Sequence, residues 1–349
     1  MKHVLGRQIG LSLILIFLGS LLLISVLMAV SIGAVSISLT DIWHVVAYHF
    51  FGWYETSTIL EGYEEDIIWN LRMPRVMLAV IVGVGLSISG TVMQAIVRNI
   101  LADPYILGLS SGASLGATLA IMIGVGTFLG NEVIGGCAFL GALLAAFFVL
   151  LLSGHSASPV KLLLSGMVIS AICSAISSFI IFFADNKEGM QSITFWLMGS
   201  LSNATWNQIS FLFSLTIIFS GVIWLSSKIL NMMLVGDEAA ITMGISLELY
   251  RKIYIVVVSL IVGFIVYASG MIGFVGLIIP HCVRSVIGTN HWRLLPVVAL
   301  VGAIFMVWAD ILCRMIIPGS EMPIGVLIAI VSAPFFIYLL VHKMYGFGG

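Results

Sequence analysis

Residues 75–97 read RVMLAVIVGVGLSISGTVMQAIV, an apolar run whose single charged residue is Arg75. A helix needs about 20 predominantly apolar residues to cross the hydrocarbon core of a bilayer. The chain continues as RNILADPYILGLSSGA over 98–113, where Pro104 breaks the helix before apolar sequence resumes. A spanning run followed by a broken continuation predicts a polytopic membrane protein built from helices.

The composition of the whole chain agrees with this prediction. Of its 349 residues, 61% are hydrophobic and only 8% are charged, against about 25% in an ordinary soluble domain. The mean hydropathy is +1.21. The 14 Lys and Arg and the 15 Asp and Glu leave a net charge of −1, so the overall charge points to no partner. Soluble enzymes, disordered proteins and basic nucleic-acid-binding proteins are therefore excluded.

Ten apolar runs are predicted to be membrane helices, so the N and C termini lie on the same side. Within the runs, apolar and polar residues do not alternate over the length of a strand, which favours an all-α protein over membrane-spanning strands. Their close spacing predicts a single transmembrane domain over residues 1–349, with no soluble domain attached. The runs lie near 10–36, 75–97, 105–124, 131–153, 160–184, 207–227, 252–270, 272–287, 295–317 and 323–342.

The Lys and Arg residues predict the orientation. With both termini in the cytoplasm, ten of the 14 fall on the inner side, as the positive-inside rule requires. The four on the outer side are Arg72, Arg75, Lys187 and Arg314. The three arginines stand next to predicted helix ends and need another explanation. Asp310 and Arg314, at i and i+4, are expected to pair on one helix face, which lowers the cost of a charge in a span.

Two long connections lie on the outer side. The first, 37–74, is expected to hold a short helix over 42–51 that is capped by Thr40 and Asp41. The second, 185–206, contains Phe195 and Trp196 and is expected to form an interfacial helix with an aromatic anchor.

A third connection, about 229–250, lies on the inner side and is too polar to span. Gly236 and Gly244 punctuate a predicted helix of one to two turns, with acidic residues in its first turn. A second short helix is expected to open at 246–249. Such a helix pair is suited to docking a soluble partner, and a solvated loop is the alternative that local sequence leaves open.

Two broken stretches lie at membrane depth, 98–113 and 269–281. Irregular backbone is tolerated there only where it is buried in protein or lines a water-filled path. A translocation path is therefore predicted, and plain glycine-mediated helix packing is the alternative. The candidate path residues are Asn99, Asp103, Pro104, Gly108, Ser110, Ser111, Gly112, Gly273, Gly276 and Pro280.

Motifs for catalysis and metal binding are absent from the sequence. It contains no Walker A motif, no HExxH and no GxSxG. The four Cys form no CxxC pair, the 17 Met are scattered, and a lone His281 more often bonds a neighbouring helix than a metal. We therefore expect no enzyme activity and no metal site.

Several collinear blocks resemble the FecCD-type permeases of ABC importers for iron-siderophores, haem and cobalamin. Together they cover about residues 70–340, with Ile100 where the family usually has proline. The blocks are RMPR at 72–75, RNILADPYILG at 98–108, GFVGLIIPH at 273–281, NHWRLLP at 290–296, Ala309-Asp310 with Arg314, EMPIG at 321–325 and APFF at 333–336.

The resemblance implies a transport subunit of the bacterial cytoplasmic (inner) membrane. Such permeases pair with a second permease chain, as a homodimer or with a paralogue, around a central path. Two cytoplasmic ATPase subunits dock on the inner face, and an extracytoplasmic substrate-binding protein delivers the substrate. ATP and Mg would bind the ATPase, so no cofactor is expected on this chain. Membrane lipids are the remaining partners, and no nucleic acid is expected.

The resemblance also implies roles for residues. The ATPase-coupling residues would be Gly236, Asp237, Glu238, Ala239, Met243, Gly244 and Ile245. The positions of Arg72, Arg75 and Arg314 match outer-face arginines that receive acidic residues of the binding protein. Pairing with Glu64, Glu65 and Asp66 in the same chain, or contact with lipid headgroups, is the alternative.

The substrate expected from the resemblance is a metal chelate, with a ferric siderophore first and haem or cobalamin as alternatives. An ion-coupled secondary transporter is a different class with similar helices. It would place a charged relay near the membrane midplane, whereas Asp103 and Asp310 lie toward opposite ends of their spans. A channel or scaffold is disfavoured by the elaborate inner connection.

Overall fold

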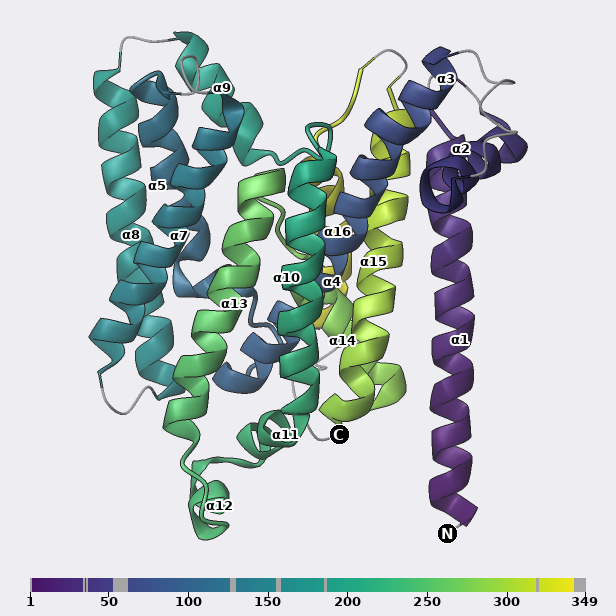
Figure 1. Cartoon of the computed structure of the whole chain (residues 1–349). Helices are drawn as coiled ribbons and strands as arrows, with labels where there is room; N and C mark the ends of the chain where they lie inside the picture. The colour runs from purple at the N-terminus through teal and green to yellow at the C-terminus, as the bar shows by residue number, and fades with distance from the viewer. Residues whose placement is uncertain are drawn as a thin grey trace.

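The structure is a computed structural model that describes residues 2–33, 35, 37–52, 62–125, 130–154, 158–184, 187–317 and 320–341. Within these residues every regular element is a helix and there is no strand. Most of the helices run side by side across one thick layer (Figure 1). The expectation of an all-α membrane protein is confirmed.

Ten apolar helices correspond one to one with the ten predicted runs. Seven are long and apolar enough to cross a membrane: α1 (Lys2–Ser31), α4 (Met73–Val97), α7 (Asn131–Ser153), α8 (Pro159–Phe183), α10 (Trp206–Leu225), α13 (Leu247–Ser269) and α15 (His291–Met315). The three further apolar helices are α5 (Leu109–Met122), α14 (Val275–Ile287) and α16 (Ile324–Val341). Both α5 and α14 are short because each directly follows one of the two predicted breaks.

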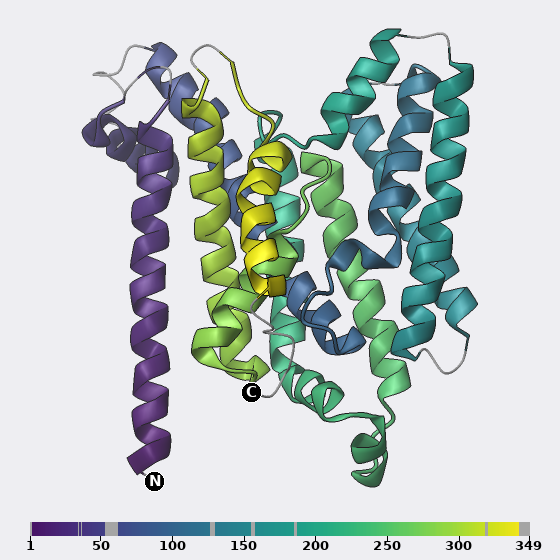
Figure 2. The same cartoon turned by 180° about the vertical axis from the view of Figure 1, so that it is seen from behind.

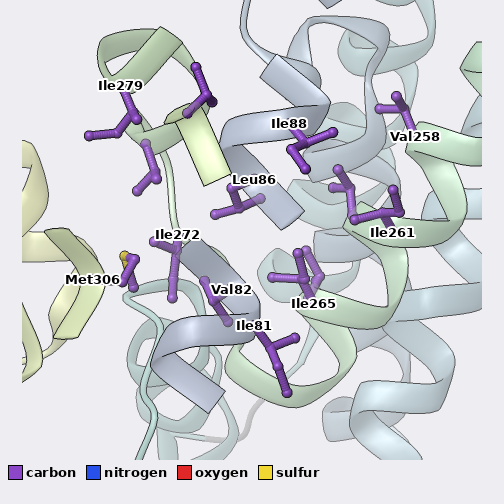
Figure 3. Packing of buried hydrophobic residues seen from close by; sticks show 14 of the residues in the cluster. Ile81, Val82, Leu86, Ile88, Val258, Ile261, Ile265, Ile272, Ile279 and Met306 are labelled. Carbon is purple, nitrogen blue, oxygen red and sulfur yellow. The ribbon is translucent and has the colours of Figure 1, made fainter. Parts of the chain in front are cut away.

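Helix α4 forms the centre of the bundle and α1 stands at its edge. In the spanning window of α4, 83% of the residues are buried, against 17% in that of α1. Glycines allow this burial, since Gly83 meets the backbone of Gly302 and Gly90 meets that of Gly276. Figure 3 shows apolar side chains of α4 packed between two neighbours. On one side lie side chains of α13, such as Ile265, and on the other lies Ile272 of the segment that joins α13 to α14.

The short helices are divided between the two faces of the membrane. α2 (Leu39–Phe51), α3 (Gly62–Asp66) and α9 (Lys187–Leu197) lie on one face (Figures 1 and 2). α11 (Ser227–Val235) and α12 (Asp237–Thr242) lie on the other, where α1 begins and toward which α16 runs. This arrangement agrees with an even number of crossings. Residues 53–61 and 185–186 of the two outer connections lie outside the described part of the chain.

Two local predictions are wrong. α2 begins earlier than expected, because Ser38 rather than Thr40 or Asp41 is its N-cap and its Oγ accepts a bond from the Asp41 N–H at 3.2 Å. The expected second short helix at 246–249 is instead the first turn of α13. No Gly or Pro follows Ser246 until Gly263, so nothing separates that turn from the spanning helix.

Candidate functional site

The first broken stretch begins where α4 ends. Arg98 takes a left-handed conformation with φ 54°, which closes the helix. Asp103 then caps a single 3₁₀ turn, η3 (Pro104–Leu107), with Oδ1 accepting a bond from the Tyr105 N–H at 2.9 Å. Gly108, at φ 78°, turns the chain into α5. The break predicted at Pro104 is therefore confirmed as a turn between two helices.

The second broken stretch separates α13 from α14. Gly270 ends α13 with φ 67°, inside the predicted broken stretch at 269–281, and the helical conformation resumes only at Val275. Phe274 has φ 68°, a conformation that a bulky side chain rarely adopts. Its side chain is 37% exposed. Strained backbone of this kind concentrates at functional sites, and sequence analysis did not identify Phe274 as a path residue.

The two broken stretches, predicted independently, lie against each other. A Cβ placed on Gly276 would stand 2.7 Å from Cδ of Pro104, so only glycine allows this approach. Asp103 also interacts with the backbone N–H of Phe274. Helix α4 leads into the first stretch and also bonds to the second, because Gln94 Nε2 donates to the Leu277 carbonyl at 3.3 Å.

The candidate path residues divide into packing and open positions. Gly112 meets the backbone of Gly141 in α7, and a Cβ on Gly108 would lie 3.1 Å from Oγ of Ser170 in α8. These two glycines, like Gly276, fit the helix-packing alternative. Pro280 is buried within α14. The positions that keep some exposure are Asn99, Asp103, Ser110 and Ser111. Open space surrounds the position that a Cβ on Gly273 would take.

A cavity of about 1090 Å³ opens on the outer side of these breaks. It reaches down to Ser269 and Gly270 of the second break. Hydroxyl and amide side chains line much of it, and sequence analysis missed them. The signal was present in the polar run at 200–205. The lining side chains of this kind are Asn70, Ser192, Ser200, Ser202, Asn203, Thr205, Gln208, Tyr267 and Ser269.

The outer arginines form part of a charged cluster that is buried except for Glu321, and we call it the outer cluster (Arg72, Arg75, Asp310, Arg314 and Glu321). Arg75 Nε donates to Asp310 Oδ1 at 2.7 Å, and its terminal nitrogen donates to Glu321 Oε1 at 2.7 Å. Arg314 Nε lies 3.2 Å from Asp310 Oδ2. The predicted i, i+4 pair of Asp310 and Arg314 is confirmed.

The same cluster holds the outer end of α1. Arg72 donates to the carbonyls of Val30, at 2.6 Å, and Val35, at 2.5 Å. Arg314 donates to the carbonyls of Ala29 and Ile32, each at 2.9 Å. These carbonyls belong to the last turn of α1 and the residues after it, where backbone acceptors lack helical partners and a positive charge is favourable. Two of the three anomalous arginines therefore cap α1.

Of the three acids that sequence analysis offered as alternative partners, Glu65 and Asp66 are engaged elsewhere, and within the described residues no contact joins Glu64 to the outer arginines. Glu65 lies 3.0 Å from His49, and Asp66 accepts a bond from Asn70 at 2.9 Å. Docking of a binding protein by the outer arginines stays a prediction, and their side chains are largely committed within the chain.

A second charged cluster lies on the inner side, and we call it the inner cluster (Arg98, Asp237 and Arg251). Asp237 Oδ1 accepts a bond from Arg98 at 2.7 Å and one from Arg251. Burial alone would raise the pKa of Asp237, but the hydrogen bond and charge of Arg251, together with the charge of Arg98, hold it below the ordinary value. The carboxylate thus joins the ends of α4 and α13 to α12.

The predicted coupling helix is present as α12. Gly236, at φ 125°, and Gly244, at φ 78°, bound it as expected. Its apolar side chains Ile241 and Met243 are exposed. Exposed apolar residues on a cytoplasmic protrusion suit a protein contact. Contact of this helix with an ATPase stays a prediction, as for the coupling residues Glu238, Ala239 and Ile245.

The preceding helix, α11, is fixed to the bundle. Asn231 Oδ1 accepts a hydrogen bond from the backbone N–H of His291 at 2.9 Å, and the same oxygen lies 2.7 Å from the imidazole Nδ1 of His291. Trp224 stacks on Trp292 with ring centroids 4.6 Å apart, which fixes the chain just before α11. Gly236 therefore joins an anchored helix to a protruding one.

No group of three or more His, Cys, Asp or Glu side chains in the described residues is arranged to hold a metal ion.

Comparisons with known proteins agree with the motifs and the geometry. The FecCD transport family model matches residues 21–342. The chain is 37% identical over 293 residues to a cobalamin import system permease of Halobacterium salinarum, covering 83% of this chain and 75% of that protein. It is 35% identical over 291 residues to a vitamin B12 import system permease of Klebsiella pneumoniae, covering 83% and 87%.

A solved structure shares the fold. It is described as an inward-facing conformation of a putative metal-chelate type ABC transporter, and it superposes with a TM-score of 0.82. The two chains are 33% identical, and the match covers 94% of this chain and 99% of that one. The chain therefore belongs to the FecCD transport family, as a multi-pass inner-membrane permease of the type II ABC importers.

Proposed function

We propose that this chain is the permease of an ATP-driven importer for a cobalamin-class corrinoid. The observation that carries the proposal is 35–37% identity, over 83% of the chain, to permeases named for cobalamin and vitamin B12. A ferric siderophore, expected first from the sequence, becomes the second candidate. The solved structure described as a metal-chelate transporter favours that wider class.

The outer cavity supports a large, polar substrate. Its volume of about 1090 Å³ and its hydroxyl and amide lining offer many hydrogen bonds. Arg75, the cavity's arginine, is occupied by Asp310 and Glu321. Such a lining suits a substrate that carries many amide groups, as corrinoids do. Tight binding that discriminates between substrates is then the role of the binding protein.

The partners follow from the family and from the two faces. We infer two ATPase subunits beneath α12, a second permease chain beside the path and a substrate-binding protein on the outer face. The outer cluster remains the proposed docking surface for that protein. Because its arginines are bonded within the chain, the binding protein would meet the face that they hold together, including the half-exposed Glu321.

Uptake by the reconstituted importer tests this proposal. The permease, its ATPase and its binding protein are placed in proteoliposomes, and radiolabelled cyanocobalamin and a ferric hydroxamate are offered separately. We expect ATP-dependent accumulation of cyanocobalamin. Accumulation of the ferric hydroxamate alone would support the second candidate, and ATP-independent uptake driven by an ion gradient would refute the importer role.

A further inference from the structure

The inner cluster is the polar connection between α12 and the helices of the path. In the described part of the chain, Asp237 is the one residue of α12 whose side chain forms hydrogen bonds with other elements, and it accepts all of them. One partner, Arg251, is only 1% exposed and is fixed within α13. The other, Arg98, is 34% exposed and ends α4. A single carboxylate thus joins the protruding helix to one fixed and one accessible arginine.

Arg98 is also where the first broken stretch begins. Its left-handed backbone turns the chain toward Asn99 and on to Pro104, which packs against the second stretch at Gly276. Its side chain donates from Nε to the Met233 carbonyl of α11 at 2.9 Å. Arg98 therefore contacts both halves of the inner connection and is one peptide bond away from the candidate path.

The neighbouring contacts direct any movement of α12 toward Arg98. α11 is held to α15 through Asn231, so it does not follow α12 freely. The hinge between them is Gly236, and a Cβ there would lie 3.5 Å from a terminal nitrogen of Arg98. The arginine thus lies over the hinge, where a rotation of α12 changes its surroundings first.

We infer that Arg98 is a positioning residue that transmits movement of α12 through Asp237 to the broken stretch at 98–108. The inference rests on the proposed importer function and names the residue through which ATP use would reach the path. The exposed Asp237–Arg98 bond is weak enough to change during a cycle, as exposed ion pairs are. The Asp237–Arg251 bond keeps α12 attached to α13 while the other bond changes.

The test separates ATP hydrolysis from movement of the path. Ser111→Cys is introduced after the native cysteines are replaced, and its reaction with a water-soluble thiol reagent is compared with and without ATP and vanadate. This readout requires no substrate. In Arg98→Gln we expect ATP hydrolysis to stay within about twofold of the parent, while the nucleotide-dependent change in labelling falls at least about fivefold.

Two matched variants accompany Arg98→Gln. Arg98→Lys keeps a positive charge that can reach Asp237, so it should recover part of the labelling change. Arg293→Gln removes a cytoplasmic arginine outside the cluster and should leave both readouts unchanged. A parental labelling change in Arg98→Gln would overturn the inference. Loss of the folded protein or of the bound ATPase in that variant would also overturn it, because Arg98 would then be structural.

Failure of this inference can be told apart from failure of the proposed function. If the parent labels in a nucleotide-dependent way but accumulates no cyanocobalamin, the substrate proposal fails and the transmission inference still stands or falls on Arg98→Gln. If the parent neither binds an ATPase nor changes its labelling, both are refuted.

Discussion

The outer and inner clusters have the same chemistry in opposite environments. In each, one aspartate lies between two arginines from distant parts of the chain: Asp310 between Arg75 and Arg314, and Asp237 between Arg98 and Arg251. The side chain of Asp310 is 3% exposed, and that of Asp237 is 41% exposed. The outer cluster joins α1, α4 and α15, whereas the inner cluster joins α4, α13 and the protruding α12.

Burial decides what each cluster can do. A buried ion pair is expensive to open, because removal of one partner leaves an uncompensated charge in a medium that solvates it poorly. An exposed pair contributes little stability, because water competes for both partners. The outer cluster is therefore suited to a fixed joint, and the inner one to a contact that rearranges during transport.

The oxygen atoms sharpen this difference. Asp310 accepts a hydrogen bond from Arg75 at Oδ1, and its Oδ2 lies at ion-pair distance from Arg314 Nε. Asp237 presents Oδ1 alone to both of its arginines. An asparagine at 310 must turn its NH₂ group toward a buried arginine, while an asparagine at 237 can keep its oxygen toward both.

The largest effect is expected from Asp310→Asn. It should destabilise the permease by about 3–5 kcal/mol. The amide is neutral and its NH₂ group cannot accept a bond, so the buried guanidinium of Arg314 loses the carboxylate that balances its charge. Thermal unfolding in detergent, with the yield of monodisperse protein, measures this. Glu321→Gln is the control, since Glu321 is 50% exposed and should cost no more than about 1 kcal/mol. Equal losses in the two variants would show that the outer cluster is no buried joint.

A smaller and local effect is expected from Arg72→Gln. It removes three hydrogen bonds to carbonyls at the outer end of α1, each bond to a charged donor contributing about 1.5–3 kcal/mol. Because α1 is little buried, it should loosen while the rest of the bundle stays folded. Cross-linking between cysteines at Ser25 and Trp308, which are in contact at 3.0 Å, reports this movement.

The control for α1 is Lys187→Gln, which changes an outer-side charge on α9. It should leave the cross-linking yield at the parental value. An unchanged yield in Arg72→Gln as well would show that apolar contacts with α15 suffice to hold α1, and that the capping bonds are dispensable.

Local patterns predicted much of this architecture. The ten runs, the break at Pro104, the broken stretch at 269–281 and the helix between Gly236 and Gly244 all depend on residues close in sequence. The pair of Asp310 and Arg314 was predictable for the same reason, because i and i+4 share a helix face.

The other contacts of the two clusters could not be predicted, because most of them join segments far apart in the chain. Arg98 and Asp237 are separated by 139 positions, and Arg75 and Asp310 by 235. Arg72 bonds to backbone carbonyls, which carry no side-chain signal at all. Charge counting showed that the outer arginines needed an explanation, but it could not show that the end of α1 provides one.

Asp237→Asn is the matched counterpart of Asp310→Asn and should have a smaller effect on stability. Its oxygen can still accept a bond from the buried Arg251, so only the charge of the pair is lost, and we expect a loss of about 2 kcal/mol or less in the same thermal assay. The loss should shrink further in high salt, which screens exposed charges. A loss as large as that of Asp310→Asn would remove the distinction between a fixed and a rearranging cluster.

The smallest expected effect is that of pH on the inner cluster. The pKa of Asp237 lies below its ordinary value, so the bond's contribution is fully present above that value and is lost only as pH falls through the lower pKa of the folded protein. The nucleotide-dependent labelling of Ser111→Cys per ATP hydrolysed should therefore stay constant from about pH 5 to 8. Each sample is normalised to the nucleotide-free protein at the same pH, which removes the titration of the reporter thiol. Asp237→Asn, which has no carboxyl to protonate, gives the baseline. A fall in the parent alone toward pH 5 would mean that Asp237 takes up a proton in the working range, and that its two arginines hold it less firmly than the geometry indicates.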